Sequence, residues 1–336
     1  MYFQKHRAKV ALLREQAGQM AEFDLIARIR ARAASTRADV VLGIGDDAAL
    51  LQPAADEHLV VAMDTLNAGV HFPEETAPAD IGWKALAVNL SDLAAMGAKP
   101  AWCTLSLSLP QADAAWLDGF LDGFCALADE HDIALVGGDT TRGPLSVCVA
   151  VQGFVEPGRA LRRDGARVGD LVWVTGTIGD AAGALAQWRA QTMIEPTLRE
   201  RLDRPQPRIA IGRALAGIAH ACIDLSDGLL ADLGHVCAAS AVGAEVSLDT
   251  LPWSEALRAH FDLDTRRALQ ASGGDDYELC FTAPECARED VARIAQGTGV
   301  QIVRIGRIVA GSGVHAFDAD GEAWQAPRKG HEHFAG

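Results

Sequence analysis

The sequence predicts a two-domain α/β (α+β) protein in which helices and strands alternate. The chain has 336 residues, more than a typical single domain, and its 49% of hydrophobic residues are enough for a substantial core. Apolar runs typical of strands alternate with segments of helical spacing along both halves. We expect domains over residues 20–156 and 157–336, and we read residues 1–19 as a disordered or non-native extension before a more natural start at Met20.

The first half is expected to hold three helices and five strands. Helical spacing of apolar residues predicts helices over 22–34, 81–96 and 114–130, with Gly97 closing the second. Apolar or β-branched runs predict strands over 40–44, 59–63, 101–109, 133–136 and 145–155. Three of these strands, those ending at residues 44, 63 and 136, are expected to lead into aspartate-bearing turns.

The second half repeats the alternation after a basic, polar linker over 158–169. Strands are predicted over 171–175, 221–223, 244–248, 278–282 and 301–308, and helices over 181–187, 208–220 and 229–239. The segment that begins Asn89-Leu-Ser-Asp resembles the one that begins Asp224-Leu-Ser-Asp, one in each half. The two halves either share an α/β plan or match here by chance.

Composition excludes several classes of protein. The formal charge is −15, from 45 acidic and 30 basic side chains, so no basic face for nucleic acid is expected. The longest apolar runs, such as 147–151, are far shorter than the roughly 18 residues of a membrane span. The seven cysteines are odd in number and never spaced CxxC, which favours buried free thiols in a reducing cytoplasm.

Five short segments place aspartates beside glycine or other small residues. They are GIGDDAA (43–49), MDT (63–65), NLSD (89–92), GGDTTRG (137–143) and DLSDG (224–228). Crowded carboxylates repel one another unless a cation neutralises them. Mg²⁺ prefers oxygen ligands and commonly binds together with phosphates. The sequence therefore predicts a metal-dependent enzyme that acts on phosphates.

Several of these acids also have a purely structural interpretation. Asp46 and Asp47 are compatible with a plain turn, and Asp64 with a cap at a strand end. Asp224 and Asp227 precede a helix and are compatible with N-capping, or with a metal–phosphate cradle around Ser226. Asp92 is harder to explain this way, because an unpaired carboxylate in an apolar helix is costly to bury.

Four other candidate residues lie outside the acidic pairs. Gly138 and Asp139 follow a buried run, where glycine would let the backbone approach a phosphate closely. Asp275 lies in the glycine-led segment 273–279, which is otherwise an ordinary turn into a strand. His71 is read either as a core histidine or as a phosphate contact.

Two common nucleotide motifs are excluded. The segment from Gly43 to Ala48 has the glycine spacing of a dinucleotide fingerprint, but Asp46 and Asp47 would repel a pyrophosphate. The helix that such a motif requires is replaced by 50–53, which ends in proline. No GxxxxGK[ST] pattern occurs anywhere, so a P-loop nucleotidase is also excluded.

Taken together, seven segments in order resemble the thiamine-monophosphate kinases, a family in the superfamily of aminoimidazole ribonucleotide synthetase and selenophosphate synthetase. They are GIGDDAALL, DTLNAGVHF, KALAVNLSDLAAMGAKP, GGDTTRGPLS, RPQPRIAIG, IDLSDGLLADLGH and GGDDYELCF, and the resemblance runs from about residue 21 to 334. It implies a two-domain fold like that of the synthetase, with the N-terminal domain pairing in a homodimer. It also implies ATP-dependent phosphorylation of thiamine monophosphate to thiamine diphosphate, the final step of thiamine diphosphate biosynthesis, with several Mg²⁺ ions.

The resemblance also implies roles for individual residues. The metal ligands would be Asp47, Asp64, Asp92, Asp139, Asp224 and Asp227. The contacts to ATP would be Gly138, Asp139, Arg163 and Ser226. The thiamine phosphate site would be lined by His71, Asp275 and His331.

The chain departs from the family pattern at three places. Ala62 and Met63 stand where hydroxyl residues are usual, so any metal contact there must come from backbone carbonyls or water. Asp275 replaces the usual glutamate, and His331 replaces the usual aromatic residue. These departures affect the expected metal stoichiometry and substrate affinity more than the reaction type.

The expected mechanism needs no catalytic side chain. A phosphate monoester, whose second pKa is about 6, is mostly a dianion at neutral pH and can attack without a general base. Direct in-line transfer assisted by Mg²⁺, without a phosphoenzyme, is therefore predicted. Two alternatives stay open at this point: a sister ATP-dependent synthetase of the superfamily, and a non-catalytic protein that binds nucleotide or metal.

Overall fold

The computed structural model describes residues 22–33 and 36–325, so the predicted extension over 1–19 and His331 lie outside the described residues. The chain divides into two compact units. The first holds residues up to Pro53, Met63–Leu86 and Ala101–Val151, and the second holds Ala54–Ala62, Ala87–Pro100 and the chain from Gln152 onward. No helix in the described part of the chain is long and apolar enough to cross a membrane.

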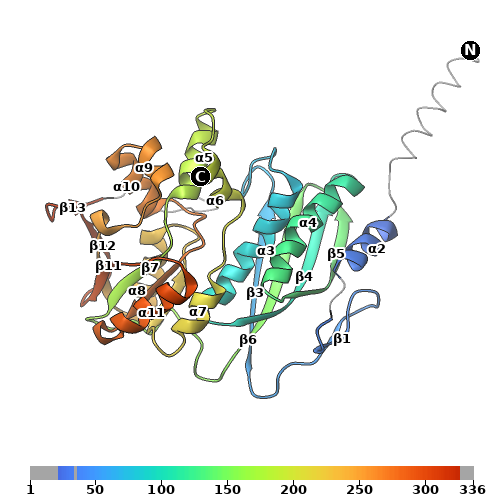
Figure 1. Ribbon diagram of the computed structural model, residues 1–336, viewed down its shortest axis with the longest axis horizontal. Helices are drawn as coiled ribbons and strands as arrows, with labels where there is room; N and C mark the ends of the chain where they lie inside the picture. Colours follow the sequence, from blue (N-terminus) through green and yellow to red (C-terminus); the bar gives the residue numbers. More distant parts are fainter. Residues whose placement is uncertain (1–21, 34–35, 326–336) are drawn as a thin grey trace, which may run out of the picture. The chain divides into compact units, whose positions relative to one another are not determined.

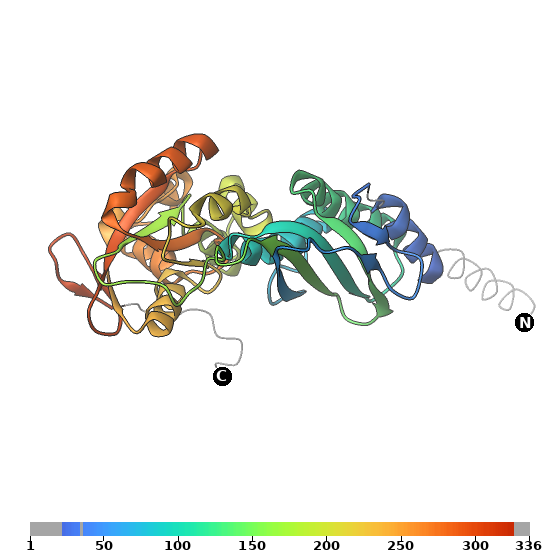
Figure 2. The same cartoon turned by 90° about the horizontal axis from the view of Figure 1, so that it is seen from below.

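A four-stranded sheet in the order β3-β6-β4-β5 forms the N-terminal layer. Its strands are β3 (His58–Asn67), β6 (Ser146–Val155), β4 (Lys99–Leu109) and β5 (Ala134–Arg142). Strands β4 and β5 are parallel neighbours, and α4 (Ala114–Glu130) makes the crossover that parallel pairing requires. Helices α3 (Pro78–Ala95) and α4 lie side by side on one face of this sheet in both views (Figures 1 and 2).

Helix α4 begins where its sequence provides a cap. The carboxylate of Asp113 accepts hydrogen bonds from the backbone N–H groups of Ala115 and Trp116, at 2.9 and 3.1 Å. The apolar positions of α4 recur at helical spacing and are buried. Gly123 allows close packing on α3, because a Cβ there would lie 1.8 Å from the carbonyl oxygen of Ala79.

The edge strand β3 leaves apolar side chains uncovered. Leu59, Val61 and Met63 alternate along the strand and are 50%, 60% and 65% exposed. Helix α2 (Glu22–Arg32), which contacts α4 and β5, and the short strands β1 (Val40–Leu42) and β2 (Leu50–Leu51) complete the N-terminal elements. The exposed β3 side chains leave an apolar surface along a sheet edge.

The C-terminal elements surround a seven-stranded mixed sheet in the order β13-β12-β9-β11-β7-β10-β8. Its strands are β7 (Leu171–Thr175), β8 (Ala221–Asp224), β9 (Gly243–Ser247), β10 (Leu279–Ala283), β11 (Ile302–Val309), β12 (Gly313–Phe317) and β13 (Ala323–Trp324). The helices are α5 (Asp180–Arg189), α6 (Pro196–Asp203), α7 (Ile209–Leu215), α8 (Leu229–Ser240), α9 (Glu255–His260), α10 (Leu263–Ser272) and α11 (Arg288–Thr298). Helix α8 packs Leu229, Leu233 and Val236 into the core that lies on this sheet.

Most predicted elements are confirmed, but two strands are longer than predicted. Strand β3 continues to Asn67, so Asp64 lies inside a strand rather than at its end. Strand β5 continues to Arg142, so Gly138 and Asp139 are also strand residues rather than part of a loop. Four short helices, α6, α9, α10 and α11, and the C-terminal hairpin of β12 and β13 were not predicted. All seven cysteines are free thiols, and four of them are buried.

Candidate functional site

The turn between β8 and α8 carries three of the predicted site residues. Strand β8 ends at Asp224, and the turn continues through Ser226 and Asp227 to Gly228. Asp224 is buried, and its Oδ2 accepts a hydrogen bond from the equally buried Ser91 of α3 at 2.8 Å. The two segments with the shared Leu-Ser-Asp pattern therefore meet. The contact places Asp92, a partly exposed neighbour of Ser91, on the same stretch of α3.

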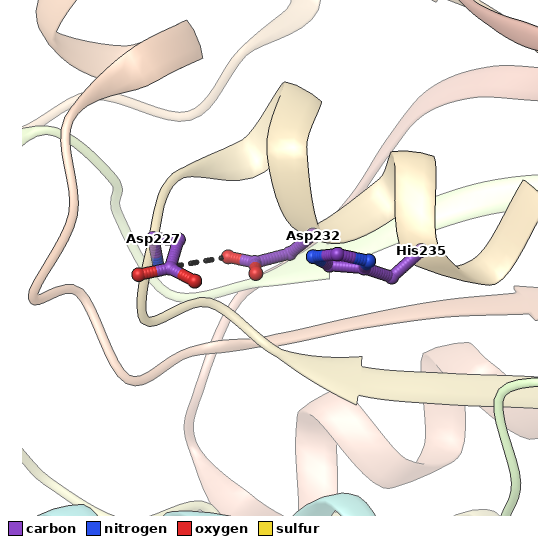
Figure 3. Close-up of side chains that lie close together, drawn as sticks. All are labelled: Asp227, Asp232 and His235. Carbon is purple, nitrogen blue, oxygen red and sulfur yellow. Dashed lines mark hydrogen bonds between the residues drawn. The ribbon is translucent and has the colours of Figure 1, made fainter. Parts of the chain in front are cut away.

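A residue that the sequence reasoning missed organises this turn. Oδ2 of Asp232 accepts hydrogen bonds from the backbone N–H groups of Ser226, Asp227 and Gly228, at 3.1, 3.1 and 3.0 Å. Figure 3 shows the bond from Asp227. These three N–H groups therefore bind an anion that the chain itself supplies. The ninth residue of the segment DLSDGLLAD, which is Asp232 itself, was the available signal.

The environment of Asp232 is strongly acidic. Burial first, and then the nearby carboxylates of Asp224 and Asp227, raise the pKa of Asp232 to about 7, against the opposing effect of the N–H donors of the turn. His235 lies one turn farther along α8, next to Asp232 (Figure 3). One ligand atom from each of Asp227, Asp232 and His235 lies within 4.8 Å of the others.

The segment 273–279 lies against the same turn. The backbone N–H of Asp275 donates to the carbonyl of Ser226 at 2.9 Å, and that of Tyr277 donates to the carbonyl of Leu225 at 2.8 Å. Gly274 is required by this approach, because a Cβ would lie 2.4 Å from the Ser226 oxygen. Two predicted site residues that are 49 positions apart, Ser226 and Asp275, are therefore neighbours.

Asp275 and Tyr277 both have left-handed backbones, with φ of 69° and 50°. Such conformations are strained for residues other than glycine and cluster at functional sites. The Tyr277 hydroxyl donates to Oδ1 of Asp275 at 3.0 Å, which orients the carboxylate that the sequence assigns to the substrate.

Asp276 and Glu278, which alternate with Asp275 and Tyr277, are buried and anchor the segment. Both carboxylate oxygens of Asp276 accept the backbone N–H of Gly179 at 2.9 Å, and burial raises the pKa of Asp276 well above its usual range. Glu278 is fully buried and accepts from Arg201, Arg208 and the hydroxyl of Thr175. The sequence reasoning missed this network, although an arginine and a glutamate inside two of the seven signature segments were the available signal.

Arg163 lies in the linker, and its side chain is exposed. The linker is fixed to the end of α8 by Ser240, whose hydroxyl donates to the Arg163 carbonyl at 2.9 Å and accepts the Ala166 N–H at 3.1 Å. The guanidinium therefore projects from an anchored backbone.

The first unit carries the remaining predicted residues. Asp46 and Asp47 are exposed in a turn where the Asp47 N–H donates to Oδ1 of Asp46 at 2.8 Å. Asp64 and Asp139 are exposed on β3 and β5. Packing in the sheet requires glycine at position 138, because a Cβ on Gly138 would lie 1.8 Å from the carbonyl oxygen of Leu105 on β4.

His71 follows β3 in a tight turn of the first unit. Its Nδ1 accepts the backbone N–H of Asn67 at 3.0 Å, so the proton of a neutral ring is on Nε2. Its carbonyl accepts the ammonium of the buried Lys84 at 3.0 Å. The ring is therefore held in one orientation by its own turn.

Family models match both halves of the chain. Residues 45–155 match the family model of the AIR synthase related protein, N-terminal domain, and residues 167–318 match that of the C-terminal domain. The fold and these two models define the class: a two-domain AIR synthase related protein, which confirms the predicted fold class.

Similar sequences and solved structures show which family of this class the chain belongs to. The thiamine-monophosphate kinase of Escherichia coli K12 is 48% identical over 319 residues, which cover 94% of this chain and 98% of the relative. The solved thiamine-monophosphate kinase of Stenotrophomonas maltophilia K279a is 58% identical with a TM-score of 0.84, covering 91% of this chain and 98% of that one. AaThiL complexed with AMPPCP and TMP is 32% identical with a TM-score of 0.74, covering 95% and 98%. The chain belongs to the thiamine-monophosphate kinase family.

Proposed function

We propose that this protein transfers the γ-phosphoryl group of ATP to thiamine monophosphate and so forms thiamine diphosphate. The observation that carries the proposal is the 48% identity to the E. coli thiamine-monophosphate kinase across 98% of that protein. The complex of AaThiL with AMPPCP, an analogue of ATP, and TMP supports the two substrates.

The described residues fit Mg²⁺ as the metal. The β8–α8 turn and the adjoining stretch of α3 supply carboxylate and hydroxyl oxygens from Asp92, Asp224, Ser226 and Asp227, the hard ligands that Mg²⁺ prefers. The negative charges of Asp224 and Asp227 contribute, after burial, to the raised pKa of Asp232. A divalent cation would offset these charges. In the first unit, Asp47, Asp64 and Asp139 would serve as further oxygen ligands.

The chain's own residues would bind and orient the reactants. When bound, Mg²⁺ neutralises the phosphates and stabilises charge on the transferring group. Arg163 and Ser226 would offer a cation and a hydroxyl to ATP, and the sequence assigns Gly138 and Asp139 to ATP as well. Because the acceptor phosphate is already largely a dianion, no protein base is assigned.

The acceptor would be oriented by the residues that the sequence assigns to it. The Asp275 carboxylate, held by Tyr277, complements the positively charged thiazolium of thiamine. His71, fixed by its turn, would present Nε2–H to the acceptor phosphate. His331 is also assigned to this site from the sequence and lies outside the described residues.

We propose that the protein works as a homodimer. Asp64 and Asp139 lie on β3 and β5, the two outer strands of the sheet, with β6 and β4 between them. Three interstrand spacings amount to about 14 Å. Two oxygens on one Mg²⁺ are at most about 4 Å apart, so one copy cannot place both residues on one ion. The exposed apolar side chains of β3 supply a surface for a second copy.

The proposed compartment is the cytoplasm. Its support is the state of the cysteines, all seven of which are free in this structure.

The reaction is tested by incubating the purified protein with ATP, Mg²⁺ and either thiamine monophosphate or free thiamine, and separating the products by chromatography. We expect thiamine diphosphate, formed one-for-one with ADP, from the monophosphate alone. Thermal stabilisation by ATP without any product would overturn the proposal in favour of a non-catalytic nucleotide-binding protein.

The dimer is tested by mixing two inactive variants, D64N and D139N, after subunit exchange. If the two residues act in one site across the dimer interface, heterodimers regain one intact site, and about a quarter of wild-type activity returns. No recovery despite demonstrated exchange would show that each copy holds a complete site.

A further inference from the structure

Asp232 is hydrogen-bonded to the backbone of the β8–α8 turn. Three consecutive N–H groups, from Ser226, Asp227 and Gly228, converge on its Oδ2 within 3.1 Å. The side chain is only 2% exposed, so water does not compete for these donors. The turn is therefore fixed at three successive peptide groups by one carboxylate oxygen.

The carboxylate itself is held by packing. Asp232 lies in the first turn of α8, between Leu229 and Leu233, which are both buried in the core of the second unit. On the other side of the turn, Gly228 has a φ of 116° and approaches Ser272 so closely that a Cβ would lie 2.9 Å from its carbonyl carbon. Asp232 thus joins a rigid helix to a turn whose path tolerates little variation.

Fixing these peptide groups also fixes the side chains between them. The Cα–Cβ directions of Ser226 and Asp227 follow from their backbones, and both residues are assigned above to ATP and metal. Groups behind metal ligands orient them, and their loss commonly weakens metal affinity by about 10- to 100-fold.

We propose that Asp232 is a positioning residue that holds Ser226 and Asp227 in the geometry that binds the metal, rather than a metal ligand itself. The proposal rests on the proposed function for the identity of the reaction. Its structural basis is the use of Oδ2 by the three N–H groups. The alternative is a ligand cluster in which Asp232 and His235 bind the ion together with Asp227.

The test measures the affinity of the intact protein for Mn²⁺, used as the probe, by the electron paramagnetic resonance of the free ion. In D232N, the amide oxygen still accepts N–H groups but carries no full charge, and we expect Mn²⁺ affinity to fall about 10- to 100-fold. D232E keeps the charge but displaces the oxygen by one methylene, and its affinity should also fall. The same variants should raise the Mn²⁺ concentration at half-maximal activity more than they lower the maximal rate.

The matched control is D262N. Asp262 accepts the Thr265 N–H at 2.9 Å at the start of α10. The D262N substitution therefore removes a carboxylate that also binds backbone N–H groups, but on the surface of another helix. Wild-type Mn²⁺ affinity is expected for D262N. Wild-type affinity in both D232N and D232E would overturn the proposal, and so would a loss in H235Q as large as that in D232N. If D232N fails to fold, D232E and H235Q decide the question alone.

The metal readout separates this proposal from the reaction. Weakened Mn²⁺ binding in a protein that does not phosphorylate thiamine monophosphate would leave the positioning role standing and overturn the proposed function. Unchanged Mn²⁺ binding by the Asp232 variants of an active kinase would overturn the positioning role and leave the proposed function standing.

Discussion

Arg208 is expected to stabilise the second unit through the buried carboxylate of Glu278. Its Nε donates to Oε2 of Glu278 at 2.6 Å, a second guanidinium nitrogen donates to Oε1, and Glu278 has no exposed surface. In R208M, a side chain of similar length replaces the guanidinium, and Glu278 keeps only Arg201 and the Thr175 hydroxyl. The substitution therefore leaves a buried negative charge with part of its compensation removed.

The size of the effect follows from this geometry. Removing one partner of a buried ion pair costs about 3 to 5 kcal/mol, and the remaining Arg201 contact at 2.7 Å places R208M near 3 kcal/mol. That loss of unfolding free energy corresponds to a fall in Tm of roughly 6 to 12 °C for a unit of this size. Differential scanning calorimetry or chemical denaturation at neutral pH measures it.

A matched surface variant makes the measurement decisive. Arg288 pairs with Glu285 at 3.2 Å, with side chains 44% and 74% exposed, so R288M is expected to cost less than about 1 kcal/mol. If R208M is no more destabilising than R288M, the assignment of the Glu278 network as an anchor of segment 273–279 is refuted.

Three further outcomes are expected. Y277F, which removes the donor to Asp275, should raise KM for thiamine monophosphate about three- to tenfold with little change in kcat, measured by initial rates. S91A should lower unfolding free energy by about 1 to 3 kcal/mol in denaturant titrations, because the buried Asp224 loses a donor. Burial raises the pKa of Asp276, so the folded state binds this proton more tightly than the unfolded state does. The free energy of unfolding of the wild type therefore falls as pH rises, and D276N lacks this loss. The Tm of D276N relative to wild type should increase between about pH 5 and pH 8.

The sequence predicts most of the elements that position the site, because their signals are local. Helix α4 was predicted over its full extent from an apolar stripe, and its cap at Asp113 is visible in the structure. The end of α3 at Gly97, which has a φ of 69°, was equally predictable from the helix-ending role of glycine. The short helices α9 and α10 lack a long apolar stripe, and their existence depends on packing against distant residues.

Strand ends were predicted less well, because sheet pairing overrides composition. Gly138 and Asp139 are typical of a loop, yet β5 continues through them by pairing with Leu105 and Ser106 on β4. In the same way, β3 continues past Asp64 to Asn67. A polar run at the edge of a sheet remains a strand when a neighbouring strand supplies its hydrogen bonds.

In the candidate site, too, the residues with a local sequence signal were predicted, and those that depend on distant partners were missed. Asp224, Ser226 and Asp275 were predicted as site residues from residue type and motif, and the structure brings them together in the second unit. Asp232 and Glu278 were not found, because their partners are backbone groups and arginines that only the fold brings near. Residues that hold other residues in place leave a weaker trace in a single sequence than those that meet a ligand.

The most direct test of the account compares thiamine diphosphate formation by wild type, D224N and D227N at saturating Mg²⁺ and ATP, with Tm measured for each. The account predicts one thiamine diphosphate per ADP from the wild type. It predicts rates lower by about 100-fold or more in both variants, because each loses several kcal/mol of metal-assisted stabilisation while remaining folded. Near-wild-type rates in folded D224N and D227N would contradict the claim that the β8–α8 turn carries the reaction.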